Sequence, residues 1–133
     1  MNYIQREQVE NAIQNAKLDS GISPIGAVLD KLLPDSYIRI VQGGTITIHV
    51  QEDTAAQELQ ERLCNIVDIF KDLEKTTKIR IKKIDAMKKE DEYIGQLPQN
   101  KKTISVELPK EVSDWLKEHS SCMIEVLNCK HTD

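Results

Sequence analysis

Two neighbouring stretches decide the fold: residues 37–50, YIRIVQGGTITIHV, and residues 54–74, TAAQELQERLCNIVDIFKDLE. In the first, isoleucines alternate with polar residues on both sides of Gly43-Gly44, which is typical of a β-hairpin with one buried face. In the second, a Thr–Gln capping-box pattern precedes apolar residues at helical spacing. Because the helix can cover the apolar face of the hairpin, the two stretches predict a two-layer α+β fold.

The isoleucine pattern also constrains the hairpin connection. A two-residue turn would set Arg39 beside Ile48, so that side chains of opposite faces would lie together. A three-residue connection over residues 43–45 instead pairs Ile40 with Ile48 and keeps the isoleucines on one face. We therefore expect an odd-length turn with a glycine bulge and this register.

In the rest of the chain, apolar periodicity predicts two helices before the hairpin, a strand after the long helix, and a β-α-β tail. The expected ranges are 4–17 and 23–33 for the helices, 78–84 for the strand, and 103–108, 109–118 and 122–127 for the tail. Residues 85–102 are polar and charged, which predicts a linker or long loop. The expected organisation is an α-α-β-β-α-β core over residues 1–84, then the linker, then an extension over 103–133. The extension either completes the same sheet or stands apart.

The composition is that of an ordinary globular chain. Of 133 residues, 39% are hydrophobic but only 4% are aromatic, so the core has to be built from Ile, Leu and Val. No apolar run approaches the roughly 18–20 residues of a membrane span, and residues 1–7 lack the apolar segment of a signal peptide. Three cysteines without C-x-x-C spacing suit a reducing compartment. We therefore expect a cytoplasmic protein that does not contact membranes.

The net charge is −4, but the charges are unevenly distributed. Residues 71–102 contain ten Lys or Arg against six Asp or Glu, whereas both flanking regions are acidic. Alternation along the strand expected at 78–84 turns its basic residues outward. These residues form the candidate nucleic-acid site, because clustered cations bind phosphates through counterion release: Lys78, Arg80, Lys82 and Lys83. The alternative is that outward charges merely solvate an edge strand and prevent its pairing.

Trp115 is the candidate protein-binding residue. It is the only tryptophan and lies in the helix expected at 109–118. If the tail is mobile, an exposed tryptophan would anchor a partner protein. The alternative is that Trp115 packs this helix against the main sheet.

The sequence gives little support for a zinc site or for a catalytic site. His119, Cys122, Cys129 and His131 are close in sequence, but a strand at 122–127 would hold the two cysteines roughly 20 Å apart, too far for one ion. Cys64 falls beside the apolar stripe of the long helix, as expected of a structural thiol. His49 has no nucleophilic partner that the sequence shows. We expect no metal, no cofactor and no enzymatic activity.

The stretch from Gly44 to Ile84 carries a family resemblance. A strand after a glycine turn, a helix opening Ala55-Ala56-Gln57-Glu58-Leu59 and a strand Lys78-Ile79-Arg80-Ile81 resemble the KH-like core of the DciA family of bacterial helicase loaders. The order of elements over residues 1–84 is also similar to that of the N-terminal interaction domain of the replication initiator DnaA. The resemblance implies a KH-like fold and a non-enzymatic adaptor that contacts DNA or a replication protein.

The sequence therefore predicts a non-catalytic interaction module that binds nucleic acid or an unidentified protein through its basic strand. A purely protein-binding adaptor, or effector-associated domain, is one alternative. A small enzyme or ligand sensor is another, and a deep pocket holding His49 or Cys64 with a polar partner would distinguish it. A homodimer is also plausible, because a lean core and exposed strand edges favour edge pairing.

Overall fold

The structure is a computed structural model that describes residues 4–16, 22–41, 46–51, 55–82, 91–97, 99, 102–120 and 122–127, with the backbone alone at 22–24 and 91–92. Within these residues the fold is α+β, as predicted, with four helices and two antiparallel sheets. The helices are α1 (Arg6–Ala16), α2 (Ile25–Leu32), α3 (Ala56–Lys75) and α4 (Lys110–His119). The strands are β1 (Ile22–Pro24), β2 (Ser36–Val41), β3 (Ile46–Gln51), β4 (Ile79–Lys82), β5 (Asp91–Ile94), β6 (Thr103–Glu107) and β7 (Met123–Val126).

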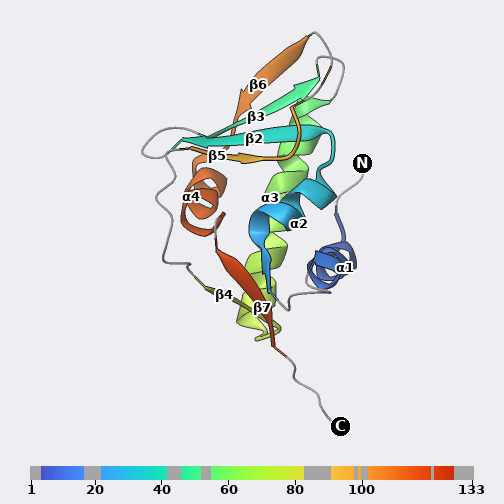
Figure 1. Cartoon of the computed structure of the whole chain (residues 1–133), viewed down its shortest axis with the longest axis vertical. Coiled ribbons are helices and arrows are strands. Elements are labelled where there is room, and N and C mark those ends of the chain that lie inside the picture. The colour runs from blue at the N-terminus through green and yellow to red at the C-terminus, as the bar shows by residue number, and fades with distance from the viewer. Residues whose placement is uncertain are drawn as a thin grey trace.

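The two sheets lie at opposite ends of α3 (Figure 1). The larger has the order β5-β2-β3-β6, and the smaller has the order β1-β7-β4. Helices α2, α3 and α4 lie on one side of the larger sheet, and α3 also contacts β4 of the smaller one (Figure 1). The long helix therefore ties together the two parts of the fold.

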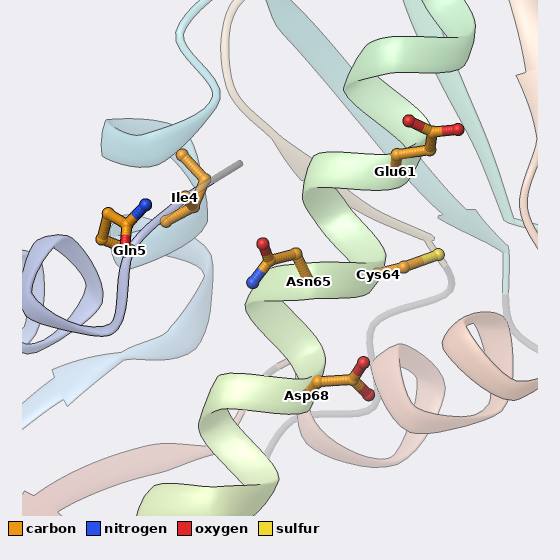
Figure 2. Close-up of a pocket in the computed structure, with 6 residues that line it drawn as sticks. All are labelled: Ile4, Gln5, Glu61, Cys64, Asn65 and Asp68. Carbon is orange, nitrogen blue, oxygen red and sulfur yellow. The ribbon is translucent and has the colours of Figure 1, made fainter. Parts of the chain in front are cut away.

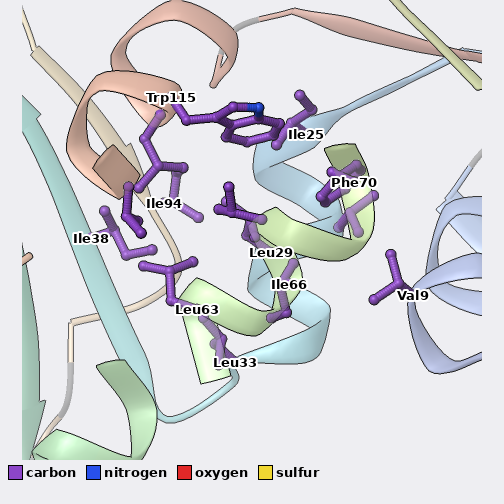
Figure 3. Close-up of a cluster of buried hydrophobic side chains, with 14 of the residues drawn as sticks. Val9, Ile25, Leu29, Leu33, Ile38, Leu63, Ile66, Phe70, Ile94 and Trp115 are labelled. Carbon is purple, nitrogen blue, oxygen red and sulfur yellow. The ribbon is translucent and has the colours of Figure 1, made fainter. Parts of the chain in front are cut away.

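The core is aliphatic, as the composition predicted. Buried side chains of α3 meet those of α2, β2 and β5, and Val9 closes the cluster from α1 (Figure 3). Ile38, Ile48 and Leu63 are at most 1% exposed. Burial of apolar surface on this scale is the main stabilising contribution to folding.

The hairpin keeps the isoleucines on one face, as predicted, but its strands pair in a different register. Ile38 pairs with Ile48, and Ile40 pairs with Ile46, so the predicted pairing of Ile40 with Ile48 is wrong by two residues. A shift of two residues leaves every side chain on the same face, so the isoleucine pattern cannot distinguish the two registers. The predicted glycine bulge lies outside the described residues.

The linker prediction was wrong where residues 91–94 form β5. This strand pairs with β2 along one edge of the larger sheet, with Ile94 buried beneath it. Gly95 then leaves the strand with φ of +87°, and a Cβ there would lie 2.6 Å from the Ser36 carbonyl oxygen. An edge strand with one solvated face can have a polar composition, and that composition concealed β5.

The structure does not confirm the predicted KH-like core with one sheet. β4 does not join β2 and β3; it pairs with β7 in the smaller sheet. The tail also divides between the sheets, because β6 pairs with β3 while β7 lies between β1 and β4. Strands were expected at β4, β6 and β7, but β1 includes residues 23 and 24, where the sequence predicted the start of a helix. Strand periodicity specifies which face is buried and not which strand is the neighbour.

Candidate binding surface on the open sheet face

The predicted basic site lies on an exposed edge strand whose cations are paired with carboxylates. The side chains of Arg80 and Lys82 on β4 are 57% and 55% exposed. Glu125 on β7, directly opposite Arg80, places Oε1 3.9 Å from Arg80 Nη1 and 3.5 Å from Lys82 Nζ. Both cations therefore share one carboxylate, which lowers the positive charge that they can offer to a phosphate.

Lys78 extends the same pattern toward α1. Its Nζ lies 3.5 Å from Glu10 Oε2, and Glu10 also pairs with Arg6, which in turn contacts Asp72 on α3. Acidic and basic groups thus alternate at this end of the molecule. Lys83, the fourth residue of the predicted site, lies outside the described residues.

Trp115 does not offer an exposed anchor, which corrects its assignment as a protein-binding residue. It is 7% exposed, and its ring lies 5.5 Å from that of Phe70 on α3. The other neighbour is His119, whose imidazole stacks on the indole with centroids 4.5 Å apart and an interplanar angle of 18°. Trp115 therefore packs, as the alternative proposed, but its ring contacts α3, whereas the alternative named the main sheet.

Cys64 lines an open groove of about 530 Å³ between α3 and the segment before α1 (Figure 2). The groove is also lined by Glu61, Asn65 and Asp68 of α3 and by Ile4 and Gln5. Asn65 extends toward Ile4 and Gln5, whereas Glu61 and Asp68 point away from them (Figure 2). Partial burial, followed by the nearby Asp68 carboxylate, raises the pKa of the Cys64 thiol. A thiol that holds its proton is a poor nucleophile, so the groove gives no support to covalent chemistry at Cys64.

The two described members of the candidate zinc cluster have structural partners. His119 Nδ1 lies 2.9 Å from the Trp115 carbonyl oxygen, and Cys122 Sγ donates to the Glu118 carbonyl oxygen at 3.3 Å. Cys129 and His131 lie outside the described residues. Among the residues that are described, no group of three or more His, Cys, Asp or Glu side chains is arranged to hold a metal ion.

A different surface collects chemically distinctive side chains: the outer face of the larger sheet. Its inner face packs on the helices, whereas every described side chain of the outer face is exposed or half-buried. Tyrosine, histidine, arginine and hydroxyl groups predominate there. The described members are Tyr37, Arg39 and Val41 of β2, Thr47, His49 and Gln51 of β3, Tyr93 of β5, and Thr103, Ser105 and Glu107 of β6.

Three rings form a row across this open face. Tyr37 and Tyr93 stack with centroids 5.6 Å apart and planes 21° from parallel. On the other side of Tyr37, the imidazole of His49 lies at 5.6 Å with a tilt of 54°. The guanidinium carbon of Arg39 lies 6.0 Å from the centroid of the Tyr93 ring, at the limit of a cation–π contact. We call Tyr37, Tyr93, His49 and Arg39 the aromatic platform.

Two contacts indicate how the platform is held. Ser105 on β6, the direct cross-strand partner of His49, hydrogen-bonds His49 Nδ1 at 2.9 Å, so the row extends to β6. His49 is in turn opposite Tyr37, whereas Tyr93 is opposite Arg39 and reaches Tyr37 diagonally. Desolvation, followed by the neighbouring Tyr93, raises the pKa of Tyr37 above 10.0. The phenol therefore stays neutral at physiological pH. Tyr93 remains 51% exposed and presents much of its ring to solvent.

Sequence reasoning missed the platform because its members come from separated elements. Tyr93 lay in the expected linker, and His49 was seen only as a residue without a partner. Ile94 and Gly95, an apolar residue followed by a turn residue, were the available signal of a strand ending beside Tyr93.

His49 and Ser105 have the residue types of a base and a nucleophile. In the described part of the chain, the His49 ring hydrogen-bonds Ser105 alone, and a nucleophile–base pair needs a third group to orient the base. The pair also lies on an open face instead of in a pocket that excludes water.

In the described part of the chain, every helix falls short of the length or apolarity that a bilayer crossing requires. Comparison of the chain with protein-family models, with curated proteins and with solved structures finds no match.

Proposed function

We propose that the protein is a non-catalytic interaction module that binds single-stranded nucleic acid on the aromatic platform of its larger sheet. The observation that carries the proposal is the stack of the half-buried Tyr37 with the exposed Tyr93, beside Arg39. Nucleobases stack on aromatic rings, each for about 1–3 kcal/mol, and this contact tolerates any base because every base has a π face. A duplex hides those faces, so the proposed ligand is single-stranded.

The polar groups around the rings fit the same ligand. Arg39 supplies a cation for a phosphate or for stacking, while Thr47, Gln51 and Ser105 supply hydrogen-bond donors and acceptors for base edges and sugar hydroxyls. Among its described residues, this surface has no dense cluster of cations. Binding should therefore depend on stacking more than on phosphate contacts, in keeping with a chain of net charge −4.

Binding through the basic strand, which the charge distribution and the alternation of residues 78–84 favoured, remains the second candidate. It rests on the exposure of Lys78, Arg80 and Lys82, each more than half exposed. Their pairing with Glu10 and Glu125 argues against it as the main site. The two candidates differ in salt dependence, because each phosphate neutralised on a single strand contributes a slope of about −0.7 to log K against log salt.

The test is fluorescence anisotropy with labelled single-stranded RNA, single-stranded DNA and duplex DNA. Under the platform proposal, Tyr93→Ser weakens single-strand binding about 5- to 150-fold, while Tyr93→Phe, which keeps the ring, preserves it. The salt slope is no steeper than about −1, as expected for one phosphate contact near Arg39.

The comparison variant is Lys78→Gln with Arg80→Gln and Lys82→Gln. A slope near −2 that disappears in this triple variant, with no effect of Tyr93→Ser, would move the site to the basic strand. Absence of binding even at low salt would reject nucleic acid as the ligand and favour the protein-binding adaptor.

A further inference from the structure

The described sheets have four edges, and three of them carry features that hinder pairing with another chain. β1 is three residues long and includes Pro24, which has no backbone N–H to donate. β4 carries Arg80 and Lys82, and the four-residue β5 begins with two acidic residues. Short length, proline and charge are the usual ways in which proteins protect an exposed edge.

β6, the fourth edge, lacks these protections. It is five residues long, pairs with β3 without a bulge, and has one charged residue, Glu107, at its end. Ile104 is 39% exposed although its partner across the ladder, Val50, is fully buried. Val106, on the same face as Ile104, is half-buried. The core-facing side of β6 therefore leaves apolar surface uncovered at the margin of the sheet.

We propose that β6 pairs with β6 of a second copy of this chain, antiparallel and about a two-fold axis at Ser105. This arrangement sets Ile104 opposite Val106 of the second copy, and the reverse, so that four apolar side chains form one cluster. Thr103 lies opposite Glu107, which avoids placing like charges together. Each side chain keeps its face, because an antiparallel two-fold pairing preserves the alternation of the strand.

One contact limits the length of the interface. Gln60 Nε2 on α3 donates to the Glu107 carbonyl oxygen at 2.6 Å, so the outermost carbonyl of β6 already has a partner. The backbone hydrogen bonds of the interface therefore come from alternate pairs around Ser105, because an antiparallel ladder alternates between hydrogen-bonded and non-hydrogen-bonded pairs. A two-fold interface repeats each of these contacts, which is the ordinary geometry of a homodimer.

The pairing has a consequence for the open face. The two sheets would join into a continuous eight-stranded sheet, and the two-fold axis would place both aromatic platforms on the same side. Five strand spacings of about 4.8 Å separate the two copies of β2, so the platforms would lie roughly 24 Å apart. The dimer itself does not depend on what the platforms bind.

The first test is sedimentation equilibrium of the full chain up to about 1 mM, a range that covers weak dimers. The wild type is expected to dimerise, and Ile104→Lys is expected to be monomeric because it places a charge in the apolar cluster. Leu97→Lys is the matched control: Leu97 is 56% exposed and lies outside β6, so this variant should dimerise as the wild type does. A monomeric wild type across the range, or a dimer that persists in Ile104→Lys, would overturn the proposal.

A second test reads the register and does not depend on how well Ile104→Lys folds. Ser105→Cys should form an intermolecular disulfide on mild oxidation, because residues facing each other on paired strands bring their Cβ atoms to about 4.5–5.5 Å. Thr103→Cys should not, because the two copies of residue 103 lie four positions apart, or roughly 13 Å. The wild type measures the background from the native thiols. Equal cross-linking of the two variants would reject this register, and cross-linking of neither would reject the interface.

Discussion

The phenol rings of Tyr37 and Tyr93 stack across the boundary between β2 and the edge strand β5, with centroids 5.6 Å apart. The stack joins a predicted strand to a segment that the sequence analysis assigned to a linker. It has two consequences: it attaches the edge strand to the sheet, and it supplies the aromatic surface on which the proposed function depends. The stability contribution can be measured without knowing the ligand.

A double-mutant cycle of Tyr37→Ala and Tyr93→Ala should give a coupling energy of about 0.5–1 kcal/mol in urea unfolding, the usual contribution of an aromatic pair. Leu97→Ala, paired with Tyr37→Ala, serves as the control and should show no coupling, since Leu97 has no ring to stack on Tyr37. Additivity within about 0.3 kcal/mol for the tyrosine cycle would mean that the rings do not stabilise each other.

Gly95→Ala should destabilise the fold by at least about 1 kcal/mol. The φ of +87° is unfavourable for any residue with a Cβ, and that Cβ would lie 2.6 Å from the Ser36 carbonyl oxygen. Gln96→Ala, one residue further and exposed, should change the stability by less than about 0.5 kcal/mol. Thermal or urea unfolding compares the two variants, and equal stabilities would contradict the close approach of β5 to β2.

Phe70→Ala should cost about 3–5 kcal/mol of stability. The ring is fully buried in α3 and lies 5.5 Å from that of Trp115, so truncation leaves a cavity between α3 and α4. The adjacent Lys71→Ala, on the exposed side of the same helix, should stay within about 0.5 kcal/mol. Fluorescence of Trp115, the only tryptophan, should also shift to longer wavelength in folded Phe70→Ala as water reaches the indole. A loss below about 1 kcal/mol would contradict this packing.

Glu125→Gln should raise the affinity of the basic strand for polyanions. The substitution removes the carboxylate shared by Arg80 and Lys82 while keeping the shape of the side chain. Elution from heparin should require higher salt than for the wild type, whereas stability should change by at most about 1 kcal/mol, because exposed ion pairs stabilise little. Glu118→Gln on α4 controls for the change in net charge. Equal shifts in both variants would show a general charge effect and not release of the two cations.

Loss of stability at high pH should involve Cys64. Burial raises its pKa above the ordinary 9.0, so the folded state holds the proton more tightly than the unfolded state. The associated stability is fully present below pH 9 and is lost as pH rises through the higher folded pKa. Cys64→Ala should therefore lose less stability than the wild type between pH 8 and pH 10.5, as measured by urea unfolding. Parallel pH profiles for the two proteins would mean that this thiol is not desolvated.

The candidate site shows how far the sequence analysis could reach. The alternation of apolar and basic residues correctly predicted that Arg80 and Lys82 point outward from a strand, since a period of two is a local property of the chain. It could not show that Glu125 would lie opposite them, because that contact depends on which strand pairs with β4. The platform was missed for the same reason, because its residues come from three strands that are separated in the sequence.

The sequence by itself determined which residues are apolar, at what spacing they recur, and therefore the long helix and the buried face of the hairpin strands. These features are local, because they follow from 3.6 residues per helical turn and from alternation along a strand. Only the tertiary structure decided how seven described strands divide into two sheets, which edge was left unprotected, and which side chains meet on the open face. Backbone hydrogen bonds are chemically alike in every strand, so the choice of neighbours depends on packing of the whole core around α3 and not on any one segment.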